Sequence, residues 1–347
     1  MNILIIGGAG YIGSQTTKAI KEKGYHPIVL DNLIHGHKHL IESILKVPLI
    51  EGQAGDKELL KNILLGGHPK LKGKTIDAII HFAAFAYIGE SVEDPAKYYR
   101  NNLGDTLSIL EVLVDQISLR EAKNIFPLKI PIVFSSTCAT YGVPKLKDIP
   151  ISENAPQNPI NPYGRSKLMI EEILKDFHNA YKIPSISLRY FNAAGADPEC
   201  DLGEHHNPET HLIPLILDAI GDDKKSIKVF GNDYPTRDGT CIRDFVHVYD
   251  LAEAHLIALK KIIYNNVCEF YNLGTGKGYS VIEVIETCKK VTGLNLNVEF
   301  VARRLGDPPM LIASPEKIME ELKWRPVYSD LETIIKHAWR WYLKINT

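Results

Sequence analysis

The sequence predicts an α/β protein: a doubly wound parallel sheet flanked by helices, followed by a second, smaller mixed α/β domain. Short apolar runs alternate with stretches of helical length through residues 1–189, and a glycine-rich segment directly follows the first run. Polar loops and shorter elements replace this alternation after residue 190. We therefore expect a first domain over 1–189, with 241–262 packing back near it, and a second domain over 190–347.

Composition excludes several classes of protein. The 347-residue chain has a formal net charge of −2, with 45% hydrophobic and 24% charged residues. These are ordinary values for a globular protein, so they indicate neither a nucleic-acid partner nor disorder. Its five cysteines are scattered without a Cys-x-x-Cys pair, which favours reduced thiols. The first apolar run is too short for a signal peptide or a membrane span, so we expect a cytoplasmic protein with no membrane partner.

The first strand–helix unit carries a nucleotide-binding pattern. The run Ile3–Ile6 predicts a strand, and Gly7–Gly13 follows it with glycines at a spacing that lets the backbone turn tightly and approach a pyrophosphate. The next strand, Ile28–Leu30, ends in Asp31, whose carboxylate suits an adenosine ribose and disfavours a 2′-phosphate. Together these features predict a Rossmann-type domain that binds NAD.

The rest of the first domain repeats this alternation, which predicts parallel strands joined by right-handed crossovers. We expect further strands at Val47–Ile50, Ala78–Phe82 and Ile132–Thr137, and helices at Asp56–Leu65, Asp94–Gln116 and Pro162–Tyr181.

The second domain is predicted to hold short elements and one long loop. Residues 193–210 are polar and rich in Gly, Pro and His, which is typical of a loop beside a substrate. Ser280 with Glu283, and Ser329 with Glu332, form capping-box patterns at helix starts. We also expect a helix at Leu212–Ile220, a strand at Val229–Phe230 and a helix capped by Asp250 that reaches about Lys261.

Tyr163 and Lys167 form the candidate catalytic pair. They are four residues apart in a predicted helix, so both project from one face. A neighbouring ammonium would stabilise the phenolate and lower the pKa of Tyr163 below its usual value of about 10. Such a pair alone is more often an ordinary helix-surface pair. Here Ser135 and Thr137 end a strand at the sheet edge where such sheets hold ligands, which favours the catalytic interpretation.

Histidines in two loops raise the question of a metal site. His35, His37 and His39 alternate in one loop, and His205 and His206 are adjacent in another. No converging thiol or carboxylate stands at a suggestive spacing, so solvated loops are favoured and we predict no metal site.

Charged residues of the second domain also have two interpretations. Arg243 and Arg304 suit a diphosphate, and Asp307 suits ribose hydroxyls, although surface ion pairs are commoner. Phe230 could stack on a base or lie in a core.

Motifs spread over nearly the whole chain match a known family. They are Gly7–Gly13, Asp31–Leu33, His81–Ala83, Gly89–Ser91, Ser135–Thr137, Tyr163 with Lys167, Arg189–Asn192, Gly231–Thr236, Asp238–Thr240, Arg243 with Asp244, Tyr271–Gly274, and Arg303-Arg304 with Gly306-Asp307. On these residues the chain resembles the extended short-chain dehydrogenase/reductases, and among them the nucleotide-sugar 4-epimerases that interconvert UDP-galactose and UDP-glucose. The resemblance implies an isomerase with tightly held NAD and a UDP-sugar substrate. It also implies a homodimer that pairs the helices near 98–116 and 163–181.

The resemblance implies roles for individual residues. Tyr163 would remove the proton of the sugar 4′-hydroxyl while the C4 hydride passes to the nicotinamide, Thr137 would hydrogen-bond that hydroxyl, and Lys167 would keep Tyr163 ionised. The 4-keto sugar would then turn over and be reduced on its other face. The cofactor contacts implied are Gly7, Gly10, Tyr11, Ile12, Gly13, Asp31, Asn32, Phe82, Ala83, Ala84, Asn101, Ser135, Tyr163, Lys167 and Tyr190. The substrate contacts implied are Thr137, Tyr163, Asn192, His211, Leu212, Phe230, Arg243, Arg304 and Asp307.

Four positions depart from the family pattern and bear on the substrate. Ala86 replaces a common Lys, His211 a common Asn and Leu311 a Tyr, all at the sugar site, while Gln53 replaces the usual acid near adenine. Leu311 leaves room for an N-acetyl group, and residues 135–142 are similar to UDP-arabinose/xylose epimerases. UDP-N-acetylglucosamine and UDP-pentose 4-epimerases therefore stay as alternatives.

Other activities on the same fold are less favoured. A nucleotide-sugar 4,6-dehydratase needs an Asp-Glu pair where Cys138 and Ala139 stand, and these residues cannot eliminate water. A non-catalytic NAD-sensing protein would not need Tyr163, Lys167 and Thr137 together. A simple alcohol dehydrogenase would depend on added, exchangeable NAD.

Overall fold

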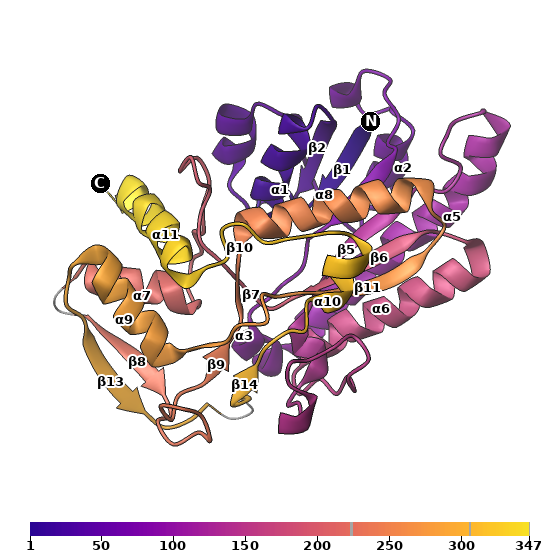
Figure 1. Cartoon of the computed structure of the whole chain (residues 1–347). Helices are drawn as coiled ribbons and strands as arrows, with labels where there is room; N and C mark the ends of the chain where they lie inside the picture. Colours follow the sequence, from indigo (N-terminus) through magenta and orange to yellow (C-terminus); the bar gives the residue numbers. More distant parts are fainter. Residues whose placement is uncertain (223–224, 305–306, 347) are drawn as a thin grey trace. The chain divides into compact units, whose positions relative to one another are not determined.

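The computed structural model describes residues 1–222, 225–304 and 307–346, and the chain divides into two compact units (Figure 1). Unit 1 comprises Met1–Thr140, Asn161–Arg189 and Ala252–Tyr271, and unit 2 comprises Tyr141–Ile160, Tyr190–Leu251 and Asn272–Thr347. Residues 141–160, expected in the first domain, lie in unit 2 because Ile151 bridges to Ala313 and Glu153 accepts a hydrogen bond from the Asn272 N–H. Within the described ranges, every helix is too short or too polar to span a bilayer.

A seven-stranded sheet in the order β11-β6-β5-β4-β1-β2-β3 forms the centre of unit 1, and β6 and β11 run on into the first residues assigned to unit 2. Its strands are β1 (Asn2–Ile6), β2 (His26–Asp31), β3 (Leu49–Glu51), β4 (Ala78–His81), β5 (Ile132–Thr137), β6 (Ser185–Tyr190) and β11 (Cys268–Leu273). The pairs β1–β2, β1–β4, β2–β3 and β4–β5 are parallel. The predicted doubly wound, Rossmann-type sheet is thus confirmed. The strand order reverses between β1 and β4, the place where such sheets bind ligands.

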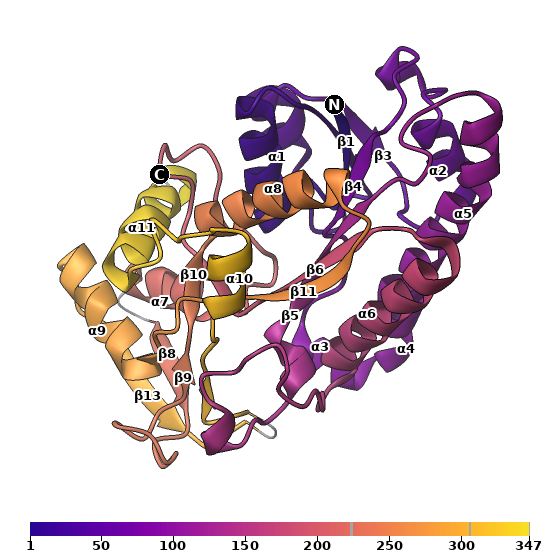
Figure 2. The same ribbon diagram turned by 45° about the vertical axis from the view of Figure 1, so that its right-hand side comes forward.

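Helices cover both faces of this sheet, which explains why the middles of β1 and β2 are apolar runs. On one face lie α2 (Lys57–Leu64), α5 (Thr106–Ala122) and α6 (Pro162–Tyr181), whose Leu60, Ile109 and Ile170 join Leu4 and Phe134 in one core. On the other face lie α1 (Tyr11–Glu22), η1 (Leu40–Leu45) and most of α8 (Val248–Tyr264) (Figure 2). The shorter elements are η2 (Pro69–Leu71), α3 (Ile88–Glu93), α4 (Pro95–Tyr98), η3 (Tyr99–Asp105), η4 (Cys138–Tyr141) and η5 (Leu146–Asp148).

The helix expected over Asp94–Gln116 is interrupted. Asp94 does cap its start, accepting a hydrogen bond from the Lys97 N–H, but η3 is a π-helical segment between α4 and α5. A π segment turns side chains away from the directions that a regular helix gives them, and such segments recur at functional sites. Here η3 carries Asn101 and Asn102.

The described residues of unit 2 form three small sheets and a separate helical layer. Parallel pairs join β8 (Ser226–Phe230) to β13 (Asn297–Val301) and β7 (Asn192–Ala194) to β10 (Phe245–His247), while β9 (Ile242–Arg243) lies between β12 (Tyr279–Ser280) and β14 (Met310–Leu311). The helices are α7 (Leu212–Ile220), α9 (Val281–Thr292), α10 (Glu316–Glu321) and α11 (Leu331–Asn346). Ile216, Ile285 and Ile334 place α7, α9 and α11 in one core (Figure 2).

Caps in unit 2 follow the predictions only in part. The Ser280–Glu283 capping box is formed with both of its hydrogen bonds. The capping box expected from Ser329 and Glu332 is not formed. Ser329 Oγ donates to the Asp250 carboxylate, and the Thr333 N–H donates to Asp330 instead. Asp250 lies inside the first turn of α8 rather than capping it. The buried Asp250 carboxylate thus links α8 to the segment that precedes α11.

Candidate active site

The glycine-rich turn after β1 lies against the end of β4. Gly7 has φ +81°, and a Cβ there would lie 2.5 Å from the Ala83 nitrogen, while a Cβ on Gly13 would lie 2.2 Å from the Gly7 oxygen. Both positions therefore require glycine. Gly10 is different, because the nearest atom to a Cβ would be 3.6 Å away. The turn is thus tightly packed at Gly7 and Gly13 and leaves room beside Gly10. Tyr11 and Ile12 begin α1 directly after this open position, which is the arrangement that a pyrophosphate-binding turn requires.

Asp31 at the end of β2 is held by this turn. Its Oδ2 accepts the Ala9 N–H at 2.9 Å and its Oδ1 accepts the Leu33 N–H at 2.8 Å. Burial raises the pKa of this carboxyl, and the two N–H donors oppose that shift. Each carboxylate oxygen retains a lone pair, so Asp31 can accept from a ribose diol while repelling a phosphate.

A chain of amides links Asn32 to the π segment. Asn32 Nδ2 donates to Gln53 Oε1 at 3.0 Å, and Gln53 Nε2 donates to Asp105 Oδ2 at 2.8 Å. Asn101 Nδ2 also donates to Asp105, at 3.0 Å. Asp105 therefore places a carboxylate next to Gln53, the position where the family pattern has an acid. Sequence spacing does not indicate this contact, since Asp105 lies 52 positions after Gln53 in the chain.

The candidate catalytic residues come together in unit 1. Thr137, at the end of β5, is hydrogen-bonded to the phenol of Tyr163 in the first turn of α6. Lys167, one turn later, is buried and donates from Nζ to the Ser135 carbonyl oxygen at 2.7 Å, with Nζ 4.7 Å from the Phe134 ring centre. The helix start that positions them is the predicted one, because Asn161 Oδ1 accepts the Gly164 N–H at 2.8 Å.

The electrostatics of the pair differ from the expectation. Burial raises the pKa of Tyr163 to about 12, against a smaller lowering by the Thr137 hydroxyl. Burial also lowers the pKa of Lys167 to about 7, with Glu171 opposing that shift. Lys167 does not lower the pKa of Tyr163 in the protein alone, since its ammonium is directed at the Ser135 carbonyl. A phenolate at neutral pH therefore needs additional positive charge beside Tyr163.

A buried ion pair behind the site fixes α6. Glu171, one turn after Lys167, accepts from Arg189 Nη2 at 2.6 Å and Nε at 2.9 Å, and from Ser136 Oγ at 2.5 Å. Both charged side chains are almost fully buried. The pair ties α6 to β5 and β6, so it sets where Tyr163 and Lys167 lie. Glu171 is not among the residues predicted from sequence, although its position four residues after Lys167 places it on the same helix face.

Asn102 fastens the segment after β4, which begins with the predicted cofactor contacts Phe82, Ala83 and Ala84. Its amide accepts the Phe85 N–H at 2.8 Å and donates to the Phe85 carbonyl at 3.0 Å and to Ser166 Oγ at 3.2 Å. Because Ser166 lies between Tyr163 and Lys167, this side chain joins the β4 loop to the catalytic turn of α6. Within η3, Asn102 is the buried residue, while Asn101 is partly exposed and donates to Asp105.

A second group of predicted site residues gathers in unit 2. The guanidinium carbon of Arg304 lies 3.8 Å from the Phe230 ring centre, and Arg243 Nη2 forms an ion pair with Asp307 Oδ1. Leu311 is the register partner of Arg243 in the β9–β14 pair. Two arginines, a carboxylate and an aromatic ring suit a nucleoside diphosphate: charge for the phosphates, an acceptor for the ribose and a stacking face for the base.

Other predicted contacts of unit 2 lie elsewhere on its elements. Asn192 begins β7 and its N–H donates to the Asp244 carbonyl at 2.9 Å, and Tyr190 is buried. Leu212 is the first residue of α7, and His211 caps that helix with its imidazole facing Glu204. The imidazole of His211 contacts Glu204 and not Arg243 or Arg304 in the described contacts. Its expected contact with the substrate stays a prediction.

Known proteins match over the whole chain. The model of the NAD dependent epimerase/dehydratase family matches residues 3–274. The UDP-glucose 4-epimerase of Streptococcus mutans is 44% identical over 343 residues, which cover 99% of this chain and 97% of the relative. The solved UDP-glucose 4-epimerase from Bifidobacterium longum in complex with NAD+ and UDP is 35% identical with a TM-score of 0.87, covering 99% of this chain and 98% of that one. The UDP-Glc/GlcNAc 4-epimerase from Campylobacter jejuni is 40% identical with a TM-score of 0.80, covering 99% of each chain. This chain belongs to the NAD dependent epimerase/dehydratase family.

Proposed function

We propose that this chain is a UDP-glucose 4-epimerase, an isomerase that interconverts UDP-galactose and UDP-glucose through a 4-keto intermediate with tightly bound NAD. The observation that carries the proposal is the grouping of Thr137, Tyr163 and Lys167 in the unit that also holds the glycine turn. The proteins that match over the full length carry the same activity in their names. A non-catalytic NAD sensor would have no use for this grouping.

The residues of unit 1 fit NAD. The turn with its open side at Gly10 would take the pyrophosphate, Asp31 the adenosine ribose, and Gln53 with Asp105 the neighbourhood of the adenine. NAD, when bound, supplies a reversible hydride acceptor for C4 of the sugar and a positive charge.

Tyr163 carries the proton. Its phenolate would remove the proton of the sugar 4′-hydroxyl, with the Thr137 hydroxyl as the hydrogen-bond partner of both oxygens. Positive charge from the cofactor and from protonated Lys167 would bring the pKa of Tyr163 down from about 12 toward neutrality. In the second half-reaction Tyr163 returns the proton to the oxygen at C4. One residue can therefore serve both faces of the sugar.

Epimerisation also requires that the nucleotide be held more firmly than the sugar. We infer that Arg243, Arg304, Phe230 and Asp307 bind UDP. The small or apolar side chains of Ala86 and Leu311 would leave the sugar few polar partners. Binding energy from the non-reacting UDP then retains the intermediate without fixing one sugar face.

We expect Arg243→Met to weaken UDP binding by about 10- to 100-fold, the effect of removing a charge-assisted hydrogen-bond donor. Isothermal titration with UDP measures this. Arg237→Met is the matched control, since Arg237 lies in the same unit but is exposed and paired with Glu283. Equal affinities of Arg243→Met and the unaltered protein would place UDP elsewhere.

A second substrate class is favoured by one residue. Leu311, in register with Arg243, stands where some family members have Tyr, and the smaller side chain leaves space for a C2 N-acetyl group. The matched Campylobacter jejuni protein is named for both UDP-Glc and GlcNAc. We therefore propose N-acetylated UDP-hexoses as alternative substrates.

The proposal is tested by incubating the purified protein with UDP-galactose, UDP-N-acetylgalactosamine and a UDP-pentose without added NAD. Chromatographic separation should show UDP-glucose forming from UDP-galactose. Turnover that appears only with added NAD, and that consumes it, would identify a dehydrogenase instead. Binding of NAD without turnover of any UDP-sugar would favour a sensor.

We further propose that the protein is a cytoplasmic homodimer. Leu107 on α5 and Met169 and Tyr181 on α6 are apolar side chains exposed by 37–44%, on the two helices that pair in the family. No disulfide joins any of the five cysteines, all of which the structure describes, as suits a reducing compartment. Light scattering coupled to size-exclusion chromatography gives the oligomeric state.

A further inference from the structure

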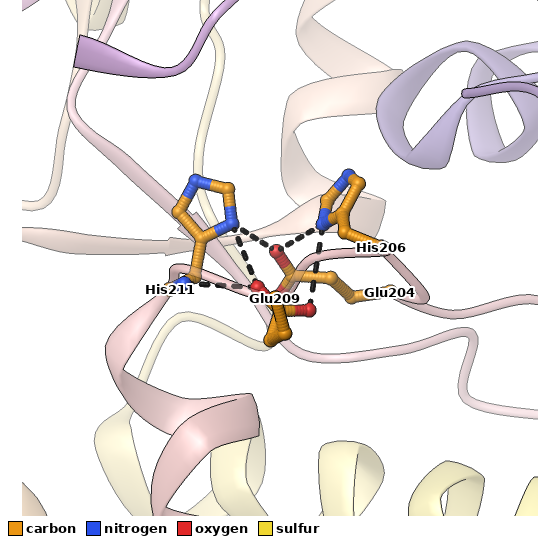
Figure 3. Close-up of side chains that lie close together, drawn as sticks. All are labelled: Glu204, His206, Glu209 and His211. Atoms are coloured by element: carbon orange, nitrogen blue, oxygen red, sulfur yellow. Dashed lines mark hydrogen bonds and ion pairs between the residues drawn. The ribbon is translucent and has the colours of Figure 1, made fainter. Parts of the chain in front are cut away.

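Four side chains from the polar segment between β7 and α7 converge on one point (Figure 3). They are Glu204, His206, Glu209 and His211, and one ligand atom from each lies within 4.8 Å of all the others. Both imidazoles present Nδ1 to the carboxylates and direct Nε2 away from them (Figure 3). Sequence spacing does not indicate this set, because the fold of the loop, and not a regular repeat, brings the glutamates and histidines together.

Three of the four nitrogen–oxygen separations in the cluster are longer than a usual hydrogen bond and close to the donor spacing of a tetrahedral metal site. His206 Nδ1 lies 3.4 Å from Glu204 Oε1 and 3.5 Å from Glu209 Oε2, and His211 Nδ1 lies 3.4 Å from Glu209 Oε1. These are long for N–H···O hydrogen bonds, which cluster near 2.9–3.0 Å. Ligand bonds of about 2.0–2.1 Å at tetrahedral angles put neighbouring donor atoms roughly 3.3–3.4 Å apart. Only His211 Nδ1 to Glu204 Oε1, at 2.7 Å, has hydrogen-bond length.

The surroundings hold both glutamates in place. Trp341 Nε1 donates to the Glu204 carbonyl at 2.9 Å, and the Glu204 side chain is buried. Glu209 Oε1 accepts the N–H groups of Thr210 at 2.7 Å and His211 at 2.9 Å, which orient its carboxylate toward the imidazoles. Outer hydrogen bonds that fix ligand orientation are typical of metal sites.

We propose that Glu204, His206, Glu209 and His211 bind a divalent transition-metal ion, with Zn²⁺ the best chemical match. Two neutral imidazoles and two carboxylates offer the nitrogen and oxygen donors that Zn²⁺ prefers, and the two negative charges balance the ion. Because all four ligands come from the protein, the site is structural rather than catalytic. The bound ion would fix residues 204–211 next to the start of α7, where His211 and Leu212 are expected to contact the substrate. The inference does not depend on the proposed epimerase activity.

The competing account is an ion-pair cluster without metal. Two protonated imidazoles would then balance the two carboxylates, and the same side chains would lie close together. The accounts differ in whether the full chain takes up one equivalent of metal with high affinity.

The experiment uses the full-length protein, stripped with a chelator and dialysed. Titration with Zn²⁺ against a chromophoric chelator should give one tight site per chain, and Co²⁺ should give the strong visible absorption of tetrahedral coordination. His206→Gln and Glu209→Gln should each weaken Zn²⁺ binding by about 100-fold or more. His205→Gln is the matched control, since His205 is the exposed neighbour outside the cluster, and it should bind Zn²⁺ as the unaltered protein does.

Three outcomes would overturn the proposal: no stoichiometric uptake of Zn²⁺, a weak octahedral Co²⁺ spectrum, or equal losses from His205→Gln and His206→Gln. If a ligand variant fails to fold, the Co²⁺ spectrum of the unaltered protein decides alone. Circular dichroism of each metal-free variant reports folding, and none of these readouts requires UDP-sugar turnover.

Discussion

Replacing Tyr163 with Phe is expected to lower kcat by about 10²- to 10⁴-fold, the contribution of a positioned acid–base group. The phenol is the group hydrogen-bonded to Thr137 at the end of β5, so the substitution removes the proton carrier and leaves the aromatic ring in place. The fold should be unaffected, because Phe keeps the aromatic ring and α6 is fixed by Asn161 and by the Glu171–Arg189 pair. Steady-state conversion of UDP-galactose measures the loss.

Tyr181→Phe is the control for this prediction. Tyr181 lies at the other end of α6 and is exposed, and Phe retains its contact with Phe177. It should keep the kcat of the unaltered protein. A Tyr163→Phe enzyme that turned over at a normal rate while retaining NAD would remove Tyr163 from the chemistry.

Lys167→Met is expected to lower activity by about 10²-fold or more and yet to stabilise the fold at low pH. The pKa of Lys167 is about 7 in the folded protein and 10.5 unperturbed, so the unfolded chain binds more protons between these values. The free energy of unfolding of the unaltered protein should therefore rise with pH across that window, and the full cost of the buried charge is present below about pH 7. Met removes that cost but also removes the hydrogen bond to Ser135. The net gain at pH 6 should be about 2–4 kcal/mol.

Urea unfolding of nucleotide-free protein at pH 6 and pH 10.5 measures this difference. The stability gain of Lys167→Met should vanish or reverse at the higher pH. There Lys167 is neutral in the folded protein, and half of the unfolded chains carry a neutral Lys167. Lys175→Met is the control on the same helix, since Lys175 is exposed and paired with Glu172, and it should change stability by less than about 1 kcal/mol. A Lys167→Met protein less stable than the unaltered one at pH 6 would show that the buried ammonium is stabilising.

The parallel sheet and its ligand-binding edge could be predicted from sequence because they depend on local signals. Strands buried on both faces read as continuous apolar runs, as at Ile3–Ile6 and Ile132–Phe134, and both lie in strands of the sheet. The start of α6 was predictable for the same reason, since Asn161-Pro162 carries its cap within the helix's own first turn.

Features that depend on distant partners could not be predicted. Ser329 is diverted from its expected cap by the Asp250 carboxylate, 79 residues away. In the π segment η3, Asn102 accepts from the Phe85 N–H and donates to the Phe85 carbonyl and to Ser166 Oγ, which no helical periodicity encodes. The pKa of Tyr163 was expected to fall, because spacing places Lys167 nearby but does not reveal that its ammonium binds the Ser135 carbonyl.

Following the hydrogen at C4 of the sugar is the most direct test of the proposed mechanism, in which that one carbon is oxidised and then reduced with tightly bound NAD. UDP-galactose deuterated at C4 is incubated with the purified protein in ordinary water without added NAD, and the product is analysed by NMR and mass spectrometry. We expect UDP-glucose that retains deuterium at C4. Exchange of that deuterium for solvent hydrogen, or net oxidation that consumes added NAD, would contradict the account.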